Sequence, residues 1–357
     1  MTFSPNGQQI VTTSNDGIVR VWNLQTASIG MQFIGHQANV GQASFSSDSK
    51  YVVTASIDNT ARIWNPQTGQ TIVTLIGHAD EVRGAVFSPD GQLVLTASAD
   101  DTAILWDVIS GEELIPLEGH TGPVHRAVFS PDGEYVVTAS WDGTARVWDT
   151  RTGQTKVIYT NQGPKRINRV AFSSNGQLVA TSGDDGTARI WDPLTGKDLM
   201  VFKGHSDRVS GVAFSPDGKY LVTCSFDGSV ILWDISSGKE IRRFAGHLGG
   251  AFGAAFSPNG KFVLTSGRDG TARLWDITTG REVRRITAHT NSVSDVAFSP
   301  DGKYILTPNE DGTARLWLTD LQDTINGVCT TLTRDLTPAE RIQFDISDQN
   351  PTCPIQQ

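Results

Sequence analysis

The chain has 357 residues, of which 38% are hydrophobic and 19% charged, and its net charge is −9. This composition is typical of a soluble globular protein, and the acidic charge argues against a surface for nucleic acid or anionic membranes. No apolar run approaches the ~18 residues of a membrane-spanning helix, and the start, MTFSPNGQQI, does not resemble a signal peptide. Three cysteines without metal-ligand spacing predict a reducing compartment, for which we expect the cytoplasm.

A repeat of 42 residues runs along the chain and is marked by eight tryptophans; one interval, from Trp148 to Trp191, is 43 residues. A period in this range indicates one supersecondary unit per repeat, which buries its faces only against its neighbours. The marker tryptophans are Trp22, Trp64, Trp106, Trp148, Trp191, Trp233, Trp275 and Trp317.

Each repeat predicts four short strands. In one copy they cover residues 85–88, 93–98, 103–107 and 113–119, which are rich in Val, Ile, Leu and Thr and end at Gly, Asp or Pro. An Asp lies six residues before each tryptophan, and the next residue is Gly in six repeats and Asn59 or Asp101 in the other two. These residue types tolerate positive φ best, so we expect a tight hairpin there.

The spacing of the motifs resembles a known family. A GH dipeptide precedes the Trp of an LWD-like motif by 28 residues, within a four-stranded unit, as in the WD40 β-propeller family. The resemblance covers residues 1–318, and near-identical copies such as FSPDGKY and DGTARLWD are most similar to bacterial members. It implies an all-β WD40 β-propeller of four-stranded blades, built from eight repeats.

His, Thr and Asp recur 28, 10 and 6 residues before the tryptophans. A hydroxyl, a base and an acid could form a nucleophilic site, but catalysis needs one such set and not eight. The resemblance implies a structural tetrad, in which the indole donates to the hydroxyl, the hydroxyl to the imidazole, and the imidazole to the carboxylate. The predicted tetrad residues are His36, Thr54, Asp58 and Trp64; His78, Thr96, Asp100 and Trp106; His120, Thr138, Asp142 and Trp148; Thr181, Asp185 and Trp191; His205, Thr223, Asp227 and Trp233; His247, Thr265, Asp269 and Trp275; and His289, Thr307, Asp311 and Trp317.

The repeat that ends at Trp191 departs from this pattern. It has NQGPKR at 161–166 in place of GH, with one inserted residue and no histidine, so its tetrad is incomplete. The segment is either a local weak point or a specialised binding loop.

The number of blades has two solutions. In a seven-bladed ring, residues 27–33 would complete the last blade and residues 1–26 would form a spare hairpin. In an eight-bladed ring, the first blade would lack most of its innermost strand. We favour eight blades, because a spare hairpin would expose Val11, Val19, Val21 and Trp22 to water.

The last 40 residues have a different pattern. Apolar residues at helical spacing and the capping box TPAE at 337–340 predict a short helical C-terminal tail over 319–346, with a disordered end at 347–357.

The leading functional hypothesis is a non-catalytic scaffold that binds a protein or peptide partner. The family resemblance places the partner on the narrow face of the propeller, at the residue before each tetrad Asp and around the start of each innermost strand. Aromatic and arginine residues at such positions are typical interface anchors. The predicted partner-binding residues are Ile57, Arg83, His125, Trp141, Arg166, Arg208, Phe226, Phe252 and Arg268.

Two other classes of protein are alternatives to a scaffold. A propeller-framed enzyme would need a unique cluster of carboxylates, histidines or metal ligands, and no sequence motif supplies one; we therefore predict no catalytic residue, metal, cofactor or small-molecule substrate. A sensor or regulatory half of a larger signalling protein is compatible with the scaffold hypothesis.

Overall fold

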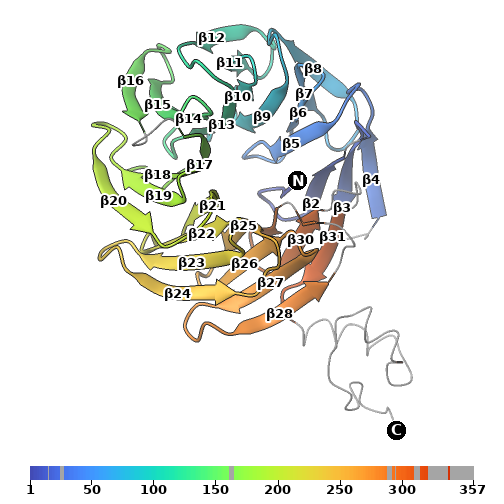
Figure 1. The fold of residues 1–357 in the computed structure, drawn as a ribbon. Helices are drawn as coiled ribbons and strands as arrows, with labels where there is room; N and C mark the ends of the chain where they lie inside the picture. Colours follow the sequence, from blue (N-terminus) through green and yellow to red (C-terminus); the bar gives the residue numbers. More distant parts are fainter. Residues whose placement is uncertain are drawn as a thin grey trace.

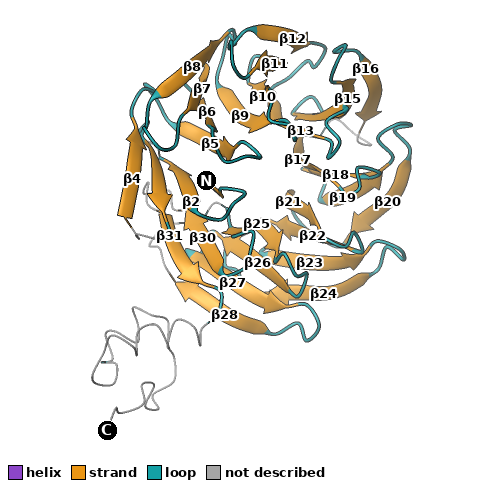
Figure 2. Ribbon diagram, turned by 180° about the vertical axis from the view of Figure 1, so that it is seen from behind, coloured by secondary structure: helices purple, strands orange, loops and turns teal. Residues whose placement is uncertain are grey.

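The computed structural model describes residues 1–14, 16–24, 28–160, 165–287, 292–293, 295–308, 314–320 and 337. Its strands form eight antiparallel sheets arranged in a ring (Figure 1). Strands are the only regular elements in these ranges (Figure 2). The expected all-β propeller is therefore confirmed, and so is the preference for eight blades.

Each sheet is one blade, numbered here in chain order. Blade 1 contains β1 (Thr2–Phe3), β2 (Gln9–Thr13), β3 (Val19–Asn23) and β4 (Ser28–Phe33); blade 2 contains β5 (Val40–Phe45), β6 (Val52–Ser56), β7 (Thr60–Trp64) and β8 (Thr71–Ile76); blade 3 contains β9 (Val82–Phe87), β10 (Leu93–Ser98), β11 (Ala103–Asp107) and β12 (Glu113–Leu117); blade 4 contains β13 (Val124–Phe129), β14 (Tyr135–Ser140), β15 (Thr144–Asp149) and β16 (Thr155–Thr160).

The second half of the ring follows the same order. Blade 5 contains β17 (Ile167–Phe172), β18 (Val179–Gly183), β19 (Thr187–Trp191) and β20 (Asp198–Lys203); blade 6 contains β21 (Val209–Phe214), β22 (Tyr220–Ser225), β23 (Ser229–Asp234) and β24 (Glu240–Ala245); blade 7 contains β25 (Ala251–Phe256), β26 (Phe262–Gly267), β27 (Thr271–Asp276) and β28 (Glu282–Thr287); in blade 8 the described strands are β29 (Ala297–Phe298), β30 (Tyr304–Pro308) and β31 (Ala314–Leu318).

The hairpin between the second and third strands of each blade requires positive φ. Gly143 and Gly228 adopt φ of 86° and 84°, and the two exceptions, Asn59 and Asp101, adopt 68° and 72°. Asn and Asp are the side chains that enter this region at least cost, so the repeat keeps its turn without glycine.

The apolar core is divided into eight clusters, one in each interface between neighbouring blades. In one of them Trp106 of blade 3 is buried together with Ile63 and Leu75 of blade 2. A blade therefore buries little by itself, because each tryptophan packs against the preceding blade.

Blades 1 and 8 close the ring through side chains. Phe3 and Ile10 of blade 1 are buried with Leu306 of blade 8, and β1 contacts both β5 and β29. Strand β4 pairs with β3 of its own blade, with Val19 opposite Phe33. The seven-bladed alternative, in which this strand completes the last blade, is thereby excluded.

The predicted helical tail at 319–346 and the predicted disordered end at 347–357 lie outside the described residues, apart from residues 319, 320 and 337. They remain predictions.

Ring closure can be tested at Ile10, which is 2% exposed. We expect Ile10→Ala to lower the free energy of unfolding by about 2–4 kcal/mol, as for other buried large-to-small changes. The control is Ile34→Ala, because Ile34 is 73% exposed and its truncation should change stability by less than about 0.5 kcal/mol. Equal urea-unfolding curves for the two variants would contradict the packing of blade 1 into the ring.

Candidate functional site

The hydrogen-bonded tetrads fix the face on which the candidate site lies. In blade 3, Trp106 Nε1 donates to Thr96 Oγ1 at 2.8 Å, and Thr96 Oγ1 lies 2.7 Å from His78 Nε2. His78 Nδ1 lies 2.8 Å from Asp100 Oδ2. Since an indole only donates and a carboxylate only accepts, the hydroxyl donates to Nε2 and the imidazole donates through Nδ1–H.

The same three contacts link all four side chains in blades 2, 3, 4, 6 and 7. Blades 1 and 8 show the indole bond, from Trp22 to Thr12 and from Trp317 to Thr307, both at 3.1 Å. His289 and Asp311 lie outside the described residues. The four other complete tetrads are His36, Thr54, Asp58 and Trp64; His120, Thr138, Asp142 and Trp148; His205, Thr223, Asp227 and Trp233; and His247, Thr265, Asp269 and Trp275.

Each tetrad carboxylate joins two loops. Asp100 Oδ2 accepts from the backbone N–H of Ala79, in the loop before β9, and Oδ1 accepts from the N–H and hydroxyl of Thr102 in the β10–β11 hairpin. The loop and the hairpin are thus held together at one end of the blade. We call this end of the ring the narrow face, as in the family.

Blade 5 lacks the histidine, so its tetrad is incomplete. Among the described residues, the buried Trp191 Nε1 has no hydrogen-bond partner. Tyr159 of blade 4 stacks on the Trp191 ring at 4.5 Å between centroids, and its hydroxyl donates to Asp198 at 2.7 Å. Arg189 forms two ion pairs: its Nη1 lies 3.3 Å from Asp198 Oδ2, and its Nη2 lies 3.5 Å from Asp185 Oδ2. An aromatic stack and an ion-pair network therefore occupy the interface around Trp191.

Burial and hydrogen bonding set the protonation states of the tetrads. Burial lowers the pKa of His36, His78, His205 and His247, and outweighs the opposing effect of the aspartates. Burial by itself would raise the pKa of Asp58, but hydrogen bonds from Thr60, Gln37 and His36 outweigh it and lower this pKa to about 2. The resting tetrad is thus a neutral imidazole beside an ionised carboxylate.

An aromatic cluster lies on the narrow face of blades 3 to 5. The half-buried Trp141, in the β14–β15 hairpin, stacks on His125 with 5.4 Å between ring centroids. The guanidinium carbons of Arg83 and Arg166 lie 4.4 and 4.3 Å from the centroid of the Trp141 ring. Burial, followed by the charge of Arg126, lowers the pKa of His125 to about 3, so this imidazole is neutral.

A second cluster lies on blades 6 and 7. The rings of Phe226 and Phe252 meet edge to face at 5.3 Å, and the guanidinium carbon of Arg208 lies 3.6 Å from the centroid of the Phe226 ring. A hollow of about 340 Å³ joins this cluster to the first one; His125, Asn168, Arg169, Arg208, Ser210, Phe226 and Phe252 line it.

Seven of the nine predicted partner-binding residues therefore fall into two connected groups. Ile57 is 44% exposed in the β6–β7 hairpin, and Arg268 is exposed beside Gly249; neither joins the two groups through an observed contact.

Arg126, Arg169 and Gln42 belong to the same region but were missed by the sequence prediction. Arg126 Nη1 donates to Gln42 Oε1 at 2.8 Å, which links blade 4 to blade 2. A side chain on Gly84 would meet Gln42 Oε1 at 2.9 Å, so the glycine in blade 3 leaves room for this bond. The available signal was the third position of the innermost strands, which is Gln42, Gly84, Arg126 and Arg169 in blades 2 to 5.

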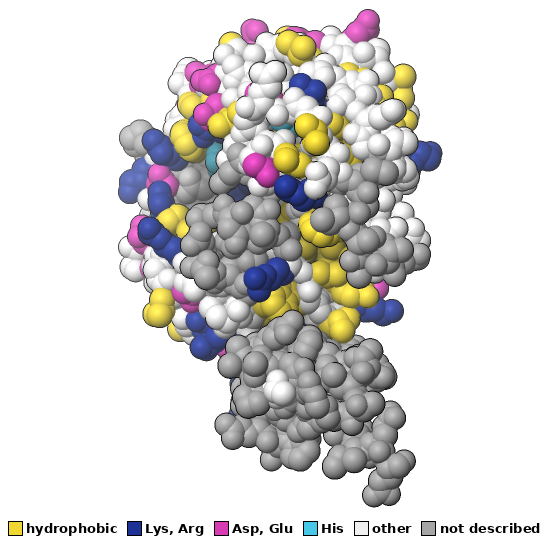
Figure 3. All heavy atoms as spheres, turned by 90° about the vertical axis from the view of Figure 1, so that its right-hand side faces the viewer, with side chains coloured by type: hydrophobic (Ala, Val, Ile, Leu, Met, Phe, Trp, Pro, Cys, Tyr) yellow, Lys and Arg dark blue, Asp and Glu magenta, His cyan; other side chains and the backbone are white. Residues whose placement is uncertain are grey.

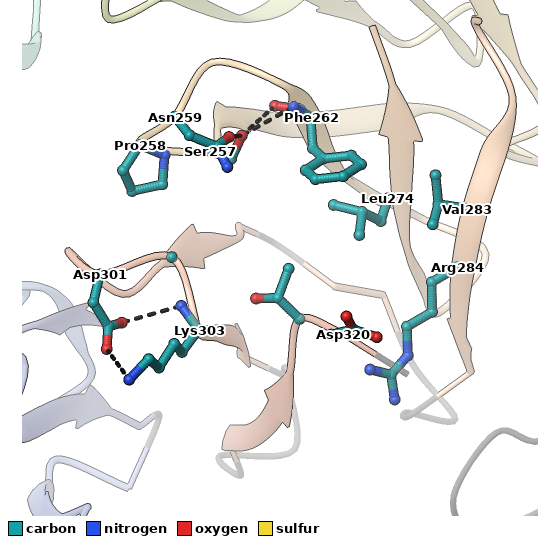
Figure 4. A pocket seen from close by; sticks show the side chains of 12 residues that line it. Ser257, Pro258, Asn259, Phe262, Leu274, Val283, Arg284, Asp301, Lys303 and Asp320 are labelled. Carbon is teal, nitrogen blue, oxygen red and sulfur yellow. Dashed lines mark hydrogen bonds and ion pairs between the residues drawn. The ribbon is translucent and has the colours of Figure 1, made fainter. Parts of the chain in front are cut away.

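Another hollow, of about 590 Å³, lies elsewhere, between blades 7 and 8 (Figure 4). Phe262, Leu274 and Val283 form its apolar side, and the turns at 257–259 and 301–303 form another. Thr319 and Asp320 also line it, and none of the predicted partner-binding residues does. We assign no site to it.

In the described part of the chain, no group of three or more His, Cys, Asp or Glu residues is arranged to hold a metal ion. The same residues include no helix of the length and apolarity that crossing a bilayer requires.

Comparison with known proteins establishes the class. The family model described as "WD domain, G-beta repeat" matches eight times, at 1–23, 28–65, 69–107, 111–149, 155–192, 196–234, 238–276 and 280–317. The chain belongs to the WD40 repeat family.

Among solved structures, the chain is similar to the computationally designed Ika8 protein. The two share 31% sequence identity with a TM-score of 0.78, over 87% of this chain and 93% of the designed one. A comparison with curated proteins gives no match.

The tetrad bonds predict a difference between two threonines. We expect Thr96→Val to lower the free energy of unfolding by about 2–4 kcal/mol, because it leaves the Trp106 N–H and the His78 Nε2 buried without a partner. Thr181→Val is the matched control: no bond links Thr181 to Trp191, and the loss should stay below about 1 kcal/mol. Equal losses in urea unfolding would show that the hydrogen bonds contribute little.

The tetrads also predict an acid-sensitive fold in two stages. The folded-state pKa of the four histidines is lowered from 6.5, so the unfolded chain binds these protons more readily and stability falls as the pH drops below about 6.5. Asp58, Asp227 and Asp269, with pKa values of about 2 against 3.8, add a second loss as the pH falls from 3.8 through 2. Urea titrations at constant ionic strength measure this; stability that rises from pH 7 to pH 5 would contradict it.

Proposed function

We propose that this protein is a non-catalytic scaffold that binds a protein or peptide partner through the narrow face of its propeller. WD40 propellers typically act as interaction scaffolds. We propose further that it acts in the cytoplasm, without a cofactor, a small-molecule substrate or nucleic acid as its ligand.

One observation carries the proposal: two guanidiniums lie over the ring of Trp141, on a hairpin that a tetrad holds. The Asp142 carboxylate next to it accepts hydrogen bonds from His120 at 2.8 Å and from the Thr121 N–H at 3.1 Å. The indole is therefore presented in a fixed position while part of its surface stays accessible. Rigid aromatic and arginine anchors of this kind contribute most of the binding energy in protein interfaces.

On the narrow face, the residues that hold the fold together are different from the residues that a partner can reach. The buried tetrad residues repeat from blade to blade, whereas the residue before each tetrad Asp is Ile57, Ala99, Trp141, Asp184 and Phe226 in blades 2 to 6. Changes at these positions alter the accessible chemistry without altering the hydrogen bonds beneath them. This arrangement supports a specific partner and not a general adhesive surface.

We expect Trp141→Ala to weaken partner binding by about 30-fold or more, which is the loss typical of an aromatic hot spot, while the melting temperature stays nearly unchanged. Partners are captured on the immobilised protein, identified by mass spectrometry, and their affinities measured with wild type and variant. The control is Leu194→Ala, which truncates an apolar side chain that is 63% exposed in the β19–β20 turn. Identical partners and affinities for both variants would exclude the narrow face, and a large loss of stability in Trp141→Ala would make Trp141 a core residue.

A further inference from the structure

Five arginines gather where the innermost strands of blades 3 to 6 begin, and we call this group the arginine mouth. They come from β9, β13, β17 and β21 or from the residues just before them, and they lie within a chain of net charge −9. On the outer side of the ring that Figure 3 shows, basic side chains are instead scattered among acidic and apolar ones. The members of the arginine mouth are Arg83, Arg126, Arg166, Arg169 and Arg208.

Two of these arginines lie close together near the ring axis. The charge of Arg169 and, after it, burial lower the pKa of Arg126 to about 9, against the opposing effect of Asp295. The side-chain hydrogen bond of Arg126 goes to the neutral amide of Gln42, and its buried Nε has no partner in the described part of the chain. Two neighbouring cations with one opposing carboxylate favour an added anion, because it would relieve their repulsion.

Aromatic rings hold three other guanidiniums in place. Arg83 and Arg166 stack on Trp141, and Arg208 stacks on Phe226. A guanidinium stacked through its flat face keeps its N–H donors in the plane of the group, where they can bind a carboxylate in a bidentate manner.

Of the three arginines that lie over aromatic rings, one forms an ion pair with a carboxylate and two do not. Arg83 pairs with Glu81 at 3.3 Å. The exposed Arg166 and Arg208 have no carboxylate within ion-pair distance among the described residues.

The hollow of about 340 Å³ provides the space for a ligand group, near the lower end of sizes typical of binding pockets. The polar atoms of Asn168 and Ser210 in its lining already donate, to Asp184 and to the carbonyl of Ala251. Arg169 and Arg208 also line it, and the buried His125 Nδ1 has no partner in the described part of the chain. The donors left for a ligand are therefore mainly cationic.

Resting on the narrow-face function, we propose that the arginine mouth binds an acidic peptide segment of the partner and that Asp or Glu side chains enter the hollow. A short peptide fits better than a nucleic acid. The carboxylates of Glu81, Asp184 and Asp207 lie within or beside this region, and a continuous phosphate backbone would have to pass over them. The acidic remainder of the protein would also repel a long polyanion.

The test is fluorescence anisotropy of a labelled octaglutamate peptide, with octalysine, a neutral Gly-Ser peptide and a single-stranded oligothymidylate as the other probes. We expect octaglutamate alone to bind, with an affinity that falls as salt is raised. The double variant Arg166→Gln/Arg208→Gln should bind it about tenfold more weakly, because both side chains are exposed and their removal leaves the core intact. The matched control, Arg151→Gln/Arg281→Gln, removes two exposed arginines in outer turns and should bind like wild type.

The same variants separate this inference from the scaffold function. If Trp141→Ala loses the captured partner while octaglutamate fails to bind, or binds both double variants equally, the acidic-peptide inference is overturned and the scaffold function stands. Tighter binding of oligothymidylate than of octaglutamate, weakened in Arg166→Gln/Arg208→Gln, would also overturn it in favour of a nucleic acid.

Discussion

The threonine hydroxyl between an indole and an imidazole is the contact on which the rest of the structure depends. It accepts from tryptophan and donates to histidine, so one buried atom satisfies two side chains that would otherwise be costly to bury. The histidine then reaches an aspartate that holds a loop and a hairpin together. Through this chain, the packing between blades is coupled to the shape of the narrow face.

Much of the fold could be predicted from the sequence because the repeats agree with one another. The strands, the hairpins at Asn59 and Asp101, and the preference for eight blades follow from period, turn chemistry and the burial of Val11 and Val19. The structure also brings most of the predicted face residues together. The contacts of the His125 ring and of two guanidiniums with the Trp141 ring could not be predicted, because they depend on the side-chain conformations of residues from three different blades.

The sequence prediction missed Arg126 and the contact between Tyr159 and Trp191, and both omissions have physical causes. Between Val124 and Arg126 the ladder shifts its register, so the strict alternation of sides along a strand does not hold there. The sequence prediction took the residues that flank the first apolar residue of each innermost strand, so it included His125, next to Val124, and passed over Arg126. In blade 5, the missing histidine was evident, but the stack of Tyr159 on Trp191 was not, since the tyrosine belongs to the preceding repeat. A ring from the preceding blade also packs on Trp64, Trp233 and Trp275, where the tetrads are complete, so this contact is a general feature of the blade interfaces.

The joint between blades 1 and 8 differs in kind from the joints elsewhere. Successive blades are connected covalently by the chain, whereas Phe3, Ile10 and Leu306 meet through dispersion and burial alone. A closed array of this sort behaves as a linear array whose two ends adhere. Once the interface between blades 1 and 8 is open, each of these two blades keeps only one interface, with its neighbour along the chain. Partial opening should therefore start at the seam, so amide protons of β2 and β30 should exchange with solvent sooner than those of β14 and β18, on the opposite side of the ring.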